Sequence, residues 1–285
     1  MASLNEIADV FRSRLVARRR GSIRYAYLGD STAVVTTHRQ LLMLVDTRDR
    51  GITPHLAISG RWESYVERVL ARLLRRGQRV VEVGANMGYH TLTMASIVGR
   101  AGHIDAFEPN PRLHELLTDS VALNGFQAIV TAHQSAALDR AGPAEFQFLP
   151  RYVGGGNVIV PGYEDATNQR FVVPGARLDD VLGDRPPVDL LRMDAEGSEP
   201  LVLKGAEELL RRSPRISIVT EFAPVMMAPR VDVPAFVGWL ESLGFRAWRI
   251  LPSGALAAVA MAALPSAQHC EIVLSRNAPP GAANR

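Results

Sequence analysis

One stretch, residues 80–93, limits the possible folds of this chain more than any other. It reads VVEVGANMGYHTLT. Residues 80–83 form a short, mostly apolar run without helical periodicity, which predicts a buried parallel strand. Residues 84–88 begin and end with glycine, which allows a sharp turn and a close approach of a ligand to the backbone. Apolar residues at helical spacing then run through residues 89–98. A strand, a glycine loop and a helix in this order predict the nucleotide-binding opening of an α/β fold.

The glycine loop differs from a dinucleotide-binding loop. It reads E-x-G-x-N-x-G, whereas the dinucleotide fingerprint is G-x-G-x-x-G. Its first residue, Glu82, interrupts an apolar strand where an unpaired carboxylate is costly to bury, so we expect it to contact a ligand. A second strand, residues 103–107, ends in Glu108, at the position where such folds bind a ribose diol. The loop alone could be an ordinary tight turn, but the two features together favour a cofactor with a ribose and no pyrophosphate.

Two further apolar strands also end in acidic residues. Residues 188–193 lead into Asp194 and Glu196, and residues 216–219 lead into Glu221. Open α/β sheets bind ligands at the carboxyl ends of their strands, so we expect these side chains at one edge of the sheet. Asp194 and Glu196 alone could be acids at the start of the helix predicted for residues 198–212, with Ser198 as its cap. Their convergence with Glu221 favours a functional site.

Three blocks of sequence resemble one enzyme family. They read VVEVGANMGYHTL, AFEPNPRLHELL with ALNG, and VDLLRMDAEGSEPLVLKGAEELL. On these motifs, residues 25–276 resemble the class I S-adenosylmethionine-dependent methyltransferases of the FkbM family. The resemblance implies an α/β, Rossmann-like fold. It has a seven-stranded, mostly parallel sheet with helices on both faces and an antiparallel last strand, a strand-rich N-terminal lead-in and a β insertion.

The resemblance also implies roles for individual residues. The acceptor would face Asp194, Glu196 and Glu221, one of which would accept its proton. Alternatively, Asp194 and Glu221 could share a divalent cation such as magnesium, although no third ligand is evident. Residues 133–137 would line the adenine, with an ordinary loop of small residues as the alternative. The residues expected to bind S-adenosyl-L-methionine are Glu82, Gly84, Ala85, Asn86, Gly88, Thr91, Glu108, Pro109, Asn110, Ser135, Ala136 and Asp194.

The implied reaction is O-methylation of a hydroxyl on a small molecule such as a secondary metabolite, sugar or glycolipid, by in-line methyl transfer. The alternatives are an N-methyltransferase acting on a peptide or amino sugar, and a non-catalytic cofactor-binding partner subunit. Two positions depart from the family pattern: Arg192 stands where members often carry Lys, and Ala223 where they often carry His. The base of this protein could therefore differ. His90 and His133 are alternative bases, although helix-start and loop roles are favoured for them.

Composition limits the number of domains, the partners and the location that we expect for this chain. With 285 residues, 47% of them hydrophobic, the chain can form one large α/β domain with a full core. Basic residues are scattered among acidic ones and the net charge is only +3, so we expect no nucleic-acid partner. The single cysteine, Cys270, excludes an internal disulfide and fits a cytoplasmic protein. We expect no signal peptide and no membrane span, and a homodimer is left open.

The expected organisation has three parts. Residues 1–78 comprise an amphipathic N-terminal helix and the strand-rich lead-in, residues 79–276 the methyltransferase domain, and residues 277–285 a disordered tail. The domain contains a β insertion at about residues 141–176. Within it, the glycine-rich residues 154–157 show neither helical nor strand periodicity. They predict a mobile loop over the substrate, with a plain surface turn as the alternative.

Overall fold

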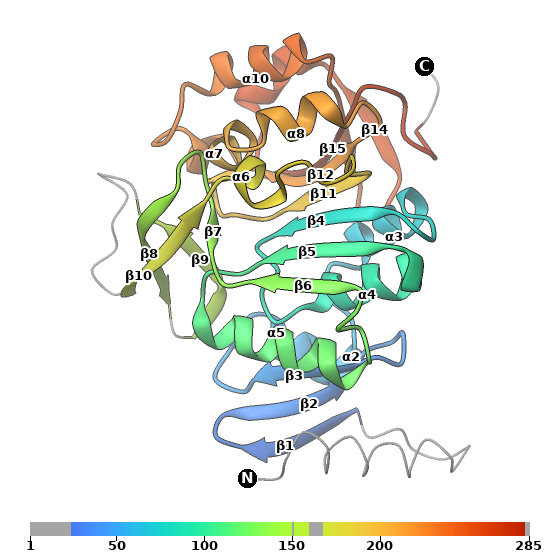
Figure 1. Cartoon of the computed structure of the whole chain (residues 1–285), viewed down its shortest axis with the longest axis vertical. Coiled ribbons are helices and arrows are strands. Elements are labelled where there is room, and N and C mark those ends of the chain that lie inside the picture. The colour runs from blue at the N-terminus through green and yellow to red at the C-terminus, as the bar shows by residue number, and fades with distance from the viewer. Residues whose placement is uncertain (1–23, 150, 160–167, 283–285) are drawn as a thin grey trace.

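The computed structural model describes residues 24–149, 151–159 and 168–282. These residues form three sheets, with helices packed on both faces of the largest one (Figure 1). The amphipathic helix expected near the N-terminus lies outside the described residues.

The largest sheet has eight strands in the order β14-β13-β15-β12-β11-β4-β5-β6. Neighbouring strands from β6 to β12 pair in parallel, and β15 inserts antiparallel between β12 and β13. This is the expected Rossmann-like arrangement with an antiparallel last strand. The strands are β4 (Arg79–Val83), β5 (His103–Phe107), β6 (Val130–His133), β11 (Leu190–Met193), β12 (Ser217–Phe222), β13 (Arg246–Ile250), β14 (Leu256–Val259) and β15 (Cys270–Ser275).

The strand β14 corrects the expected number of seven strands. The additional strand comes from the alanine-rich segment between β13 and β15. Leu256–Val259 pairs antiparallel with β13, with Ala258 opposite Trp248. The segment then continues into the 3₁₀ helix η2 (Met261–Ser266).

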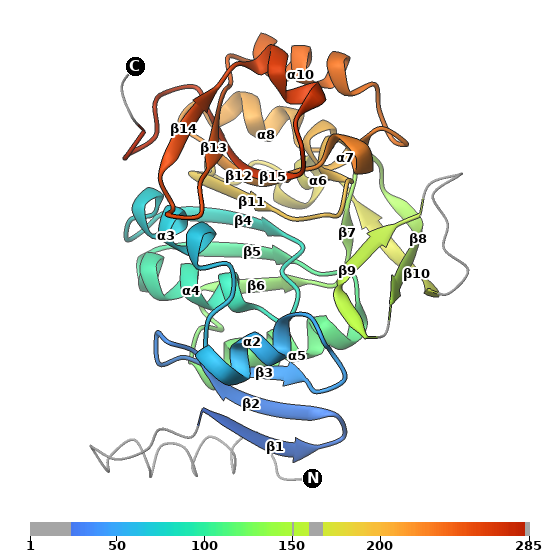
Figure 2. The ribbon, with the colours of Figure 1, turned by 180° about the vertical axis from the view of Figure 1, so that it is seen from behind.

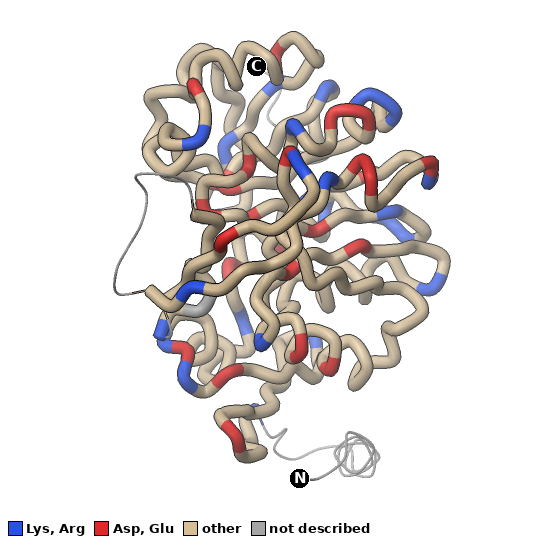
Figure 3. The backbone as a smooth tube through the Cα atoms, turned by 60° about the vertical axis from the view of Figure 1, so that its left-hand side comes forward, with Lys and Arg blue, Asp and Glu red and all other residues tan. Residues whose placement is uncertain are grey.

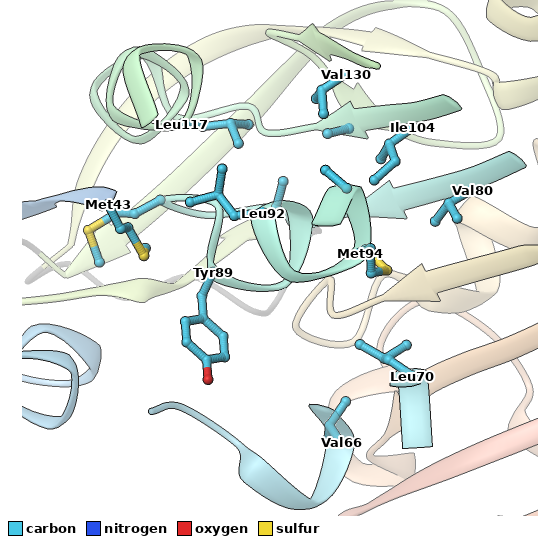
Figure 4. Packing of buried hydrophobic residues seen from close by; sticks show 14 of the residues in the cluster. Met43, Val66, Leu70, Val80, Tyr89, Leu92, Met94, Ile104, Leu117 and Val130 are labelled. Atoms are coloured by element: carbon cyan, nitrogen blue, oxygen red, sulfur yellow. The ribbon is translucent and has the colours of Figure 1, made fainter. Parts of the chain in front are cut away.

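Helices cover both faces of this sheet. One face packs against α3 (Ser64–Leu73), α4 (Tyr89–Val98) and α5 (Pro111–Leu123). Figure 4 shows Leu92 and Met94 of α4 in one cluster with Val80 and Ile104 of the strands. The other face packs against α6 (Leu178–Leu182), α7 (Glu199–Lys204), α8 (Glu207–Arg212) and α10 (Val233–Ser242). The short elements η1 (Gly99–Ala101) and α9 (Pro224–Met227) complete the helical layers.

The lead-in is a three-stranded antiparallel sheet below the main one in Figure 1. Its strands are β1 (Tyr25–Gly29), β2 (Thr32–Thr36) and β3 (Leu42–Asp46), followed by α2 (Ile52–Ser59), which the sequence did not predict. The backbone N–H of Leu44 donates to Oγ of Ser120 at 2.9 Å, and Asn124 hydrogen-bonds both backbone groups of Leu42. These bonds attach β3 to α5 and hold the lead-in against the main sheet.

The β insertion forms a sheet of its own in the order β7-β10-β8-β9. It lies at the end of the main sheet to which the arrowheads of β4, β5 and β6 point (Figures 1 and 2). Its strands are β7 (Ala136–Ala137), β8 (Gly142–Leu149), β9 (Tyr152–Val158) and β10 (Gln169–Ala176). The insertion therefore stands beside the edge where ligands bind in such sheets.

The glycine-rich residues 154–157 are part of β9, which corrects the expected loop. A Cβ on Gly156 would lie 2.6 Å from the ring of Phe146, and one on Gly154 would lie 3.1 Å from Nδ2 of Asn86. The glycines thus serve close packing against β8 and the glycine loop. An alternating side-chain pattern cannot be seen in a run without side chains, so the strand was missed.

Three other expectations differ from the structure. The helix expected at residues 198–212 is divided into α7 and α8 at Gly205, where a Cβ would lie 1.9 Å from the carbonyl oxygen of Leu138. The side chain of Ser198 makes no capping hydrogen bond.

In the tail expected to be disordered, Pro279 is buried and Ala282 forms a bridge with Leu256. Among the described residues, no helix is long and apolar enough to cross a bilayer.

Candidate active site

The carboxyl-end edge of the main sheet carries a row of residues fixed by strand register. Phe107 pairs with Val83, Val83 with Met193, and Met193 with Thr220, so the residues that follow them lie side by side. Glu221 pairs in turn with Glu271 of β15. Neighbouring strands are about 4.8 Å apart. The resulting edge row runs in the order Glu108, Gly84, Asp194, Glu221, Glu271.

Glu108 is buried at one end of the edge row and orders the backbone around it. Its Oε2 accepts a hydrogen bond from the backbone N–H of Asn86 at 2.8 Å, and its Oε1 from that of Asn110 at 2.9 Å. Asn110 is also the N-cap of α5. Burial nevertheless raises the pKa of Glu108 to about 7. Each carboxyl oxygen retains a second direction for hydrogen bonding, so Glu108 can still bind ligand hydroxyls.

The two glycines of the loop are required by close contacts. Gly84 has φ +75°, and a Cβ there would lie 1.9 Å from the carbonyl oxygen of Asp194. Gly88 has φ +95°, and a Cβ there would lie 2.7 Å from a methyl carbon of Leu117. The backbone N–H of Gly84 donates to the carbonyl of Phe107 at 3.0 Å. The spacing of the two glycines therefore reflects the path of the loop between β11 and α5.

A pocket of about 570 Å³ opens beside Glu108 and the glycine loop. Ser135 and Ala136 line it, at the position predicted for adenine contacts, and Gly154 of β9 lies across from the loop. Asp194 and Ser198 also line it. The Ser198 hydroxyl is buried and has no hydrogen-bond partner among the described residues, so it is free to bond a ligand.

A second pocket, of about 320 Å³, shares Gly84, Asn86 and Asp194 with the first. Trp62 closes it from the lead-in side, and Arg192 lies among its remaining walls. Because both pockets include Asp194, this carboxylate stands where they meet.

Arg192 is a buried cation beneath Asp194. It donates from Nη1 to the carbonyl oxygen of Gly84 and from Nη2 to Oδ2 of Asp194, each at 3.0 Å. It lies 3.6 Å from Glu63 and 3.8 Å from Glu82. Burial lowers its pKa, but these carboxylates raise it overall, so the guanidinium stays charged. The planar fork of arginine makes these contacts from one side chain, which a lysine ammonium cannot do in the same geometry.

Glu82 and Thr91 lie beneath the glycine loop, outside the residues that line the two pockets. The Thr91 hydroxyl donates to Oε2 of Glu82 at 2.5 Å. Burial raises the pKa of Glu82, and the nearby Arg192 guanidinium opposes that rise. The structure thus places Glu82 against protein groups that fix the loop, where the sequence predicted a ligand contact.

Three carboxyls gather at the other end of the edge row. Glu221 is buried beside Asp194, with its Oε1 2.6 Å from Nε2 of His269. Burial raises the pKa of Glu221 to about 10, and Asp194 and Glu196 add to the shift. Burial likewise raises the pKa of Glu196 to about 8, and the pKa of Glu271 is raised by burial and by Asp194. The structure therefore brings the predicted acids Asp194, Glu196 and Glu221 within electrostatic range of one another.

The two candidate histidines have acidic partners. Nε2 of His90 lies 3.0 Å from Oε2 of Glu63. Nε2 of His133 lies 3.0 Å from Oδ1 of Asp105, and its ring stacks on Phe107 with the centroids 4.5 Å apart. His90 lies in the first turn of α4, as favoured from the sequence, whereas His133 ends β6, where a loop role was favoured.

Several residues of the site were not predicted. Glu199 accepts a hydrogen bond from the backbone N–H of Ala195 at 2.7 Å, which fixes the loop after β11. Glu63 reaches Arg192 from the start of α3. Glu271 and His269 come from the far end of the chain through the antiparallel pairing of β15. Glu199 had a local signal, its place just after the acidic loop, whereas His269 had none because only the tertiary fold brings it to Glu221.

Charge is mixed over the rest of the molecule. Basic and acidic segments are interspersed along the backbone in Figure 3. Within the described ranges, no group of three or more His, Cys, Asp or Glu side chains is placed to hold one metal ion. The divalent cation considered from the sequence therefore has no ligand set among these residues.

Comparison with known proteins identifies a methyltransferase family. A family model described as the methyltransferase FkbM domain matches residues 82–247. The methyltransferase sdnD of Sordaria araneosa is 30% identical over 195 residues, covering 58% of this chain and 73% of that protein. A protein-L-isoaspartate O-methyltransferase of Ignicoccus hospitalis is 39% identical over 61 residues, which is 21% of this chain and 29% of that protein.

Solved structures of methyltransferases are also similar. The O-methyltransferase TomG of Streptomyces achromogenes, in complex with S-adenosylmethionine, has 15% sequence identity and a TM-score of 0.43, covering 74% of this chain and 78% of that one. The family model spans more than half of the chain and includes the edge row from Gly84 to Glu221. The chain belongs to the FkbM methyltransferase family and is an S-adenosylmethionine-dependent methyltransferase.

Proposed function

We propose that this enzyme transfers the methyl group of S-adenosylmethionine to a hydroxyl oxygen of a small molecule, and that Asp194 accepts the hydroxyl proton. The observation that carries the proposal is the position of Asp194, which lines both pockets and stands between Gly84 and Glu221 in the edge row. The acceptor classes we consider are secondary metabolites, sugars and glycolipids.

The residues of the larger pocket fit the adenosyl end of the cofactor. Glu108 presents a carboxyl to the ribose hydroxyls, Ser135 and Ala136 leave room for a flat ring, and the unpartnered Ser198 hydroxyl supplies a further hydrogen bond. When bound, the cofactor supplies an electrophilic methyl group for in-line displacement. We assign binding of the cofactor to Gly84, Ala85, Asn86, Glu108, Pro109, Ser135, Ala136 and Asp194, with Glu82, Gly88, Thr91 and Asn110 holding the loop and helix that present them.

The smaller pocket fits the methionine end. It holds the charged Arg192 guanidinium and the Asp194 carboxylate, which are complementary to a carboxylate and an ammonium group, respectively. Its shared wall with the larger pocket, Gly84 and Asn86, connects the two ends. We therefore infer that one extended cofactor occupies both pockets.

The protonation of the acids supports Asp194 as the base. Burial raises the pKa of Asp194 above its usual range while the Arg192 guanidinium opposes that rise, and a raised pKa makes a carboxylate a stronger base for proton transfer. The pKa values of Glu196 and Glu221, raised to about 8 and 10, keep these two protonated at neutral pH. They are better suited to binding an acceptor than to accepting its proton.

The test is methyl transfer from labelled S-adenosylmethionine to a panel of hydroxylated acceptors, with mass spectrometry to locate the methyl group. We expect an O-methyl product, and a decrease in kcat of about 10² to 10⁴-fold for Asp194→Asn measured at saturating cofactor. The matched control is Glu115→Gln, an exposed carboxylate on α5. An N-methyl product, or full turnover by Asp194→Asn, would contradict the proposal.

A further inference from the structure

His90 lines the smaller pocket and has one buried nitrogen without a partner. The residue is 4% exposed and lies in the first turn of α4, directly after the glycine loop. Its Nε2 lies 3.0 Å from Oε2 of Glu63, whereas its Nδ1 has no hydrogen-bond partner among the described residues. A buried polar atom that makes no hydrogen bond is unfavourable, so Nδ1 is an atom that a ligand in this pocket can satisfy.

Glu63 fixes which nitrogen of His90 carries the proton. A carboxylate only accepts hydrogen bonds, so Nε2 donates to Glu63, and Nδ1 of the neutral ring then presents a lone pair. Nη2 of Arg192 lies 3.6 Å from the same oxygen of Glu63, so this carboxylate already has a cationic partner and does not require a second one. The ring is therefore placed as a neutral hydrogen-bond acceptor.

The backbone of Glu63 has a conformation that disfavours any residue with a side chain. Glu63 is the N-cap of α3 with φ +40°, in the left-handed region, and its side chain makes no capping hydrogen bond. Strained residues of this kind occur preferentially at active and ligand-binding sites. The carboxylate extends instead to His90 and Arg192. Helix capping does not explain a glutamate at this position, whereas its contacts in the site do.

The ligand assigned to the smaller pocket has a group that needs hydrogen-bond acceptors. The methionine end of S-adenosylmethionine carries an α-ammonium, which has three N–H donors. Asp194 is the one carboxylate among the described residues that line this pocket, and its Oδ2 already accepts from Arg192. Asp194 is also the base in the proposed reaction. A second acceptor for the ammonium leaves Asp194 available to the hydroxyl that is methylated.

We propose that Nδ1 of His90 accepts a hydrogen bond from the α-ammonium of the cofactor, and that Glu63 is the positioning residue that holds the ring for this contact. The inference rests on the assignment of the methionine end to the smaller pocket. It adds two residues to the site, one from α4 and one from the start of α3. It gives His90 a role in binding the cofactor, distinct from that of the base.

The experiment compares four probes, titrated by calorimetry at pH 8 into the full-length protein. They are S-adenosylhomocysteine, its deaminated analogue, its decarboxylated analogue and 5′-methylthioadenosine, which lacks the whole amino-acid end. We expect His90→Phe to bind S-adenosylhomocysteine and the decarboxylated analogue about tenfold to a hundredfold less tightly than the wild type, as for a hydrogen bond to a charged group. Its affinity for the two probes without an ammonium should not change.

Glu63 is tested with the same probes. Glu63→Leu removes the acceptor for Nε2 of His90, so it should weaken binding of the two ammonium-containing probes. Glu63→Gln should restore most of the affinity, because its side-chain carbonyl can still accept from Nε2. The matched control is His103→Phe: Nε2 of His103 also lies beside a carboxylate, 3.6 Å from Oδ2 of Asp105, but at the start of β5 and outside the lining of both pockets. The control should bind all four probes as the wild type does.

Three results would overturn the inference. Unchanged affinity of His90→Phe for S-adenosylhomocysteine would exclude the contact. Equal weakening of all four probes would make the role of His90 structural, and weakening confined to the probes with a carboxylate would assign the ring to that group. If wild type bound S-adenosylhomocysteine no better than 5′-methylthioadenosine, the assignment of the pocket itself would fail. No methyl acceptor enters these titrations, so O-methylation fails separately, when hydroxylated acceptors yield no O-methyl product.

Discussion

The carboxyl groups at the two ends of the edge row have opposite hydrogen-bonding environments. At Glu108, both oxygens accept hydrogen bonds from backbone N–H groups, those of Asn86 and Asn110. At Glu221, one oxygen meets the exposed His269 and the other has no partner among the described residues. Fixed backbone donors prepare the cofactor end before any ligand arrives. The Glu221 end has no such backbone donors, and Oε2 of Glu221 is left without a hydrogen bond among the described residues.

Gly84→Ala should have the largest effect of the variants considered, because it displaces the glycine loop that lies between the two ends of the edge row. Its Cβ would meet the carbonyl oxygen of Asp194 at 1.9 Å, and the backbone must move to relieve the contact. We expect loss of S-adenosylhomocysteine binding by calorimetry and a lower Tm. Gly125→Ala is the matched control, since Gly125 has φ +70° with nothing within 4 Å of a Cβ. The control should cost only about 1–2 kcal/mol and keep binding; similar behaviour of both variants would refute the steric explanation.

Arg192→Met tests the buried cation at the middle of the edge row, which contacts Gly84 and Asp194. Removal of a buried partner leaves Asp194, Glu63 and Glu82 uncompensated, so the free energy of unfolding should fall by about 3–5 kcal/mol in urea denaturation. Arg192→Lys, which keeps the charge without the fork, should lose less. A methionine variant as stable as the wild type would show that the carboxylates are neutral without Arg192.

The pH dependence of stability should distinguish the two ends of the edge row. The pKa values of Glu196 and Glu221 at the acceptor end are raised further than that of Glu108 at the cofactor end. The folded protein holds protons on Glu196 and Glu221 up to about pH 8 and 10, whereas the unfolded chain releases them near its ordinary value of 4.5. Their contribution to stability is therefore complete below pH 4.5 and is lost as the pH rises through those values. The Tm should decrease between pH 5 and 9, and Glu196→Gln should reduce the slope. An unchanged slope in that variant would mean that Glu196 titrates normally.

The smallest effect is expected at the cofactor end for Asn110→Ala. Asn110 caps α5 through Oδ1, which accepts from the N–H of Arg112 at 3.0 Å, and its own N–H donates to Glu108. Loss of the cap alone should cost about 1 kcal/mol of unfolding free energy, because the backbone bond to Glu108 remains. A strong loss of cofactor affinity would instead assign the Asn110 side chain to ligand binding.

Local sequence patterns predicted the strand, glycine loop and helix next to Glu108 well. The helix expected at residues 89–98 is α4, and Glu108 and the glycine loop occupy the places that strand, turn and helix signals gave them. These signals involve only a few neighbouring residues, so they can be recognised in a single sequence. Glycines needed for packing in β9, however, look like those of a loop. The partners Glu271 and His269 reach Glu221 only through pairing of distant strands, which no local pattern records.

The most direct test of the division of the edge row is calorimetric titration of S-adenosylhomocysteine into wild type, Glu108→Ala and Glu221→Gln. This ligand carries no sulfonium charge, so it reports contacts of the cofactor end. Our account predicts that Glu108→Ala weakens binding by about 1–3 kcal/mol and that Glu221→Gln changes it little. Equal losses in both variants, or a loss in Glu221→Gln alone, would contradict it.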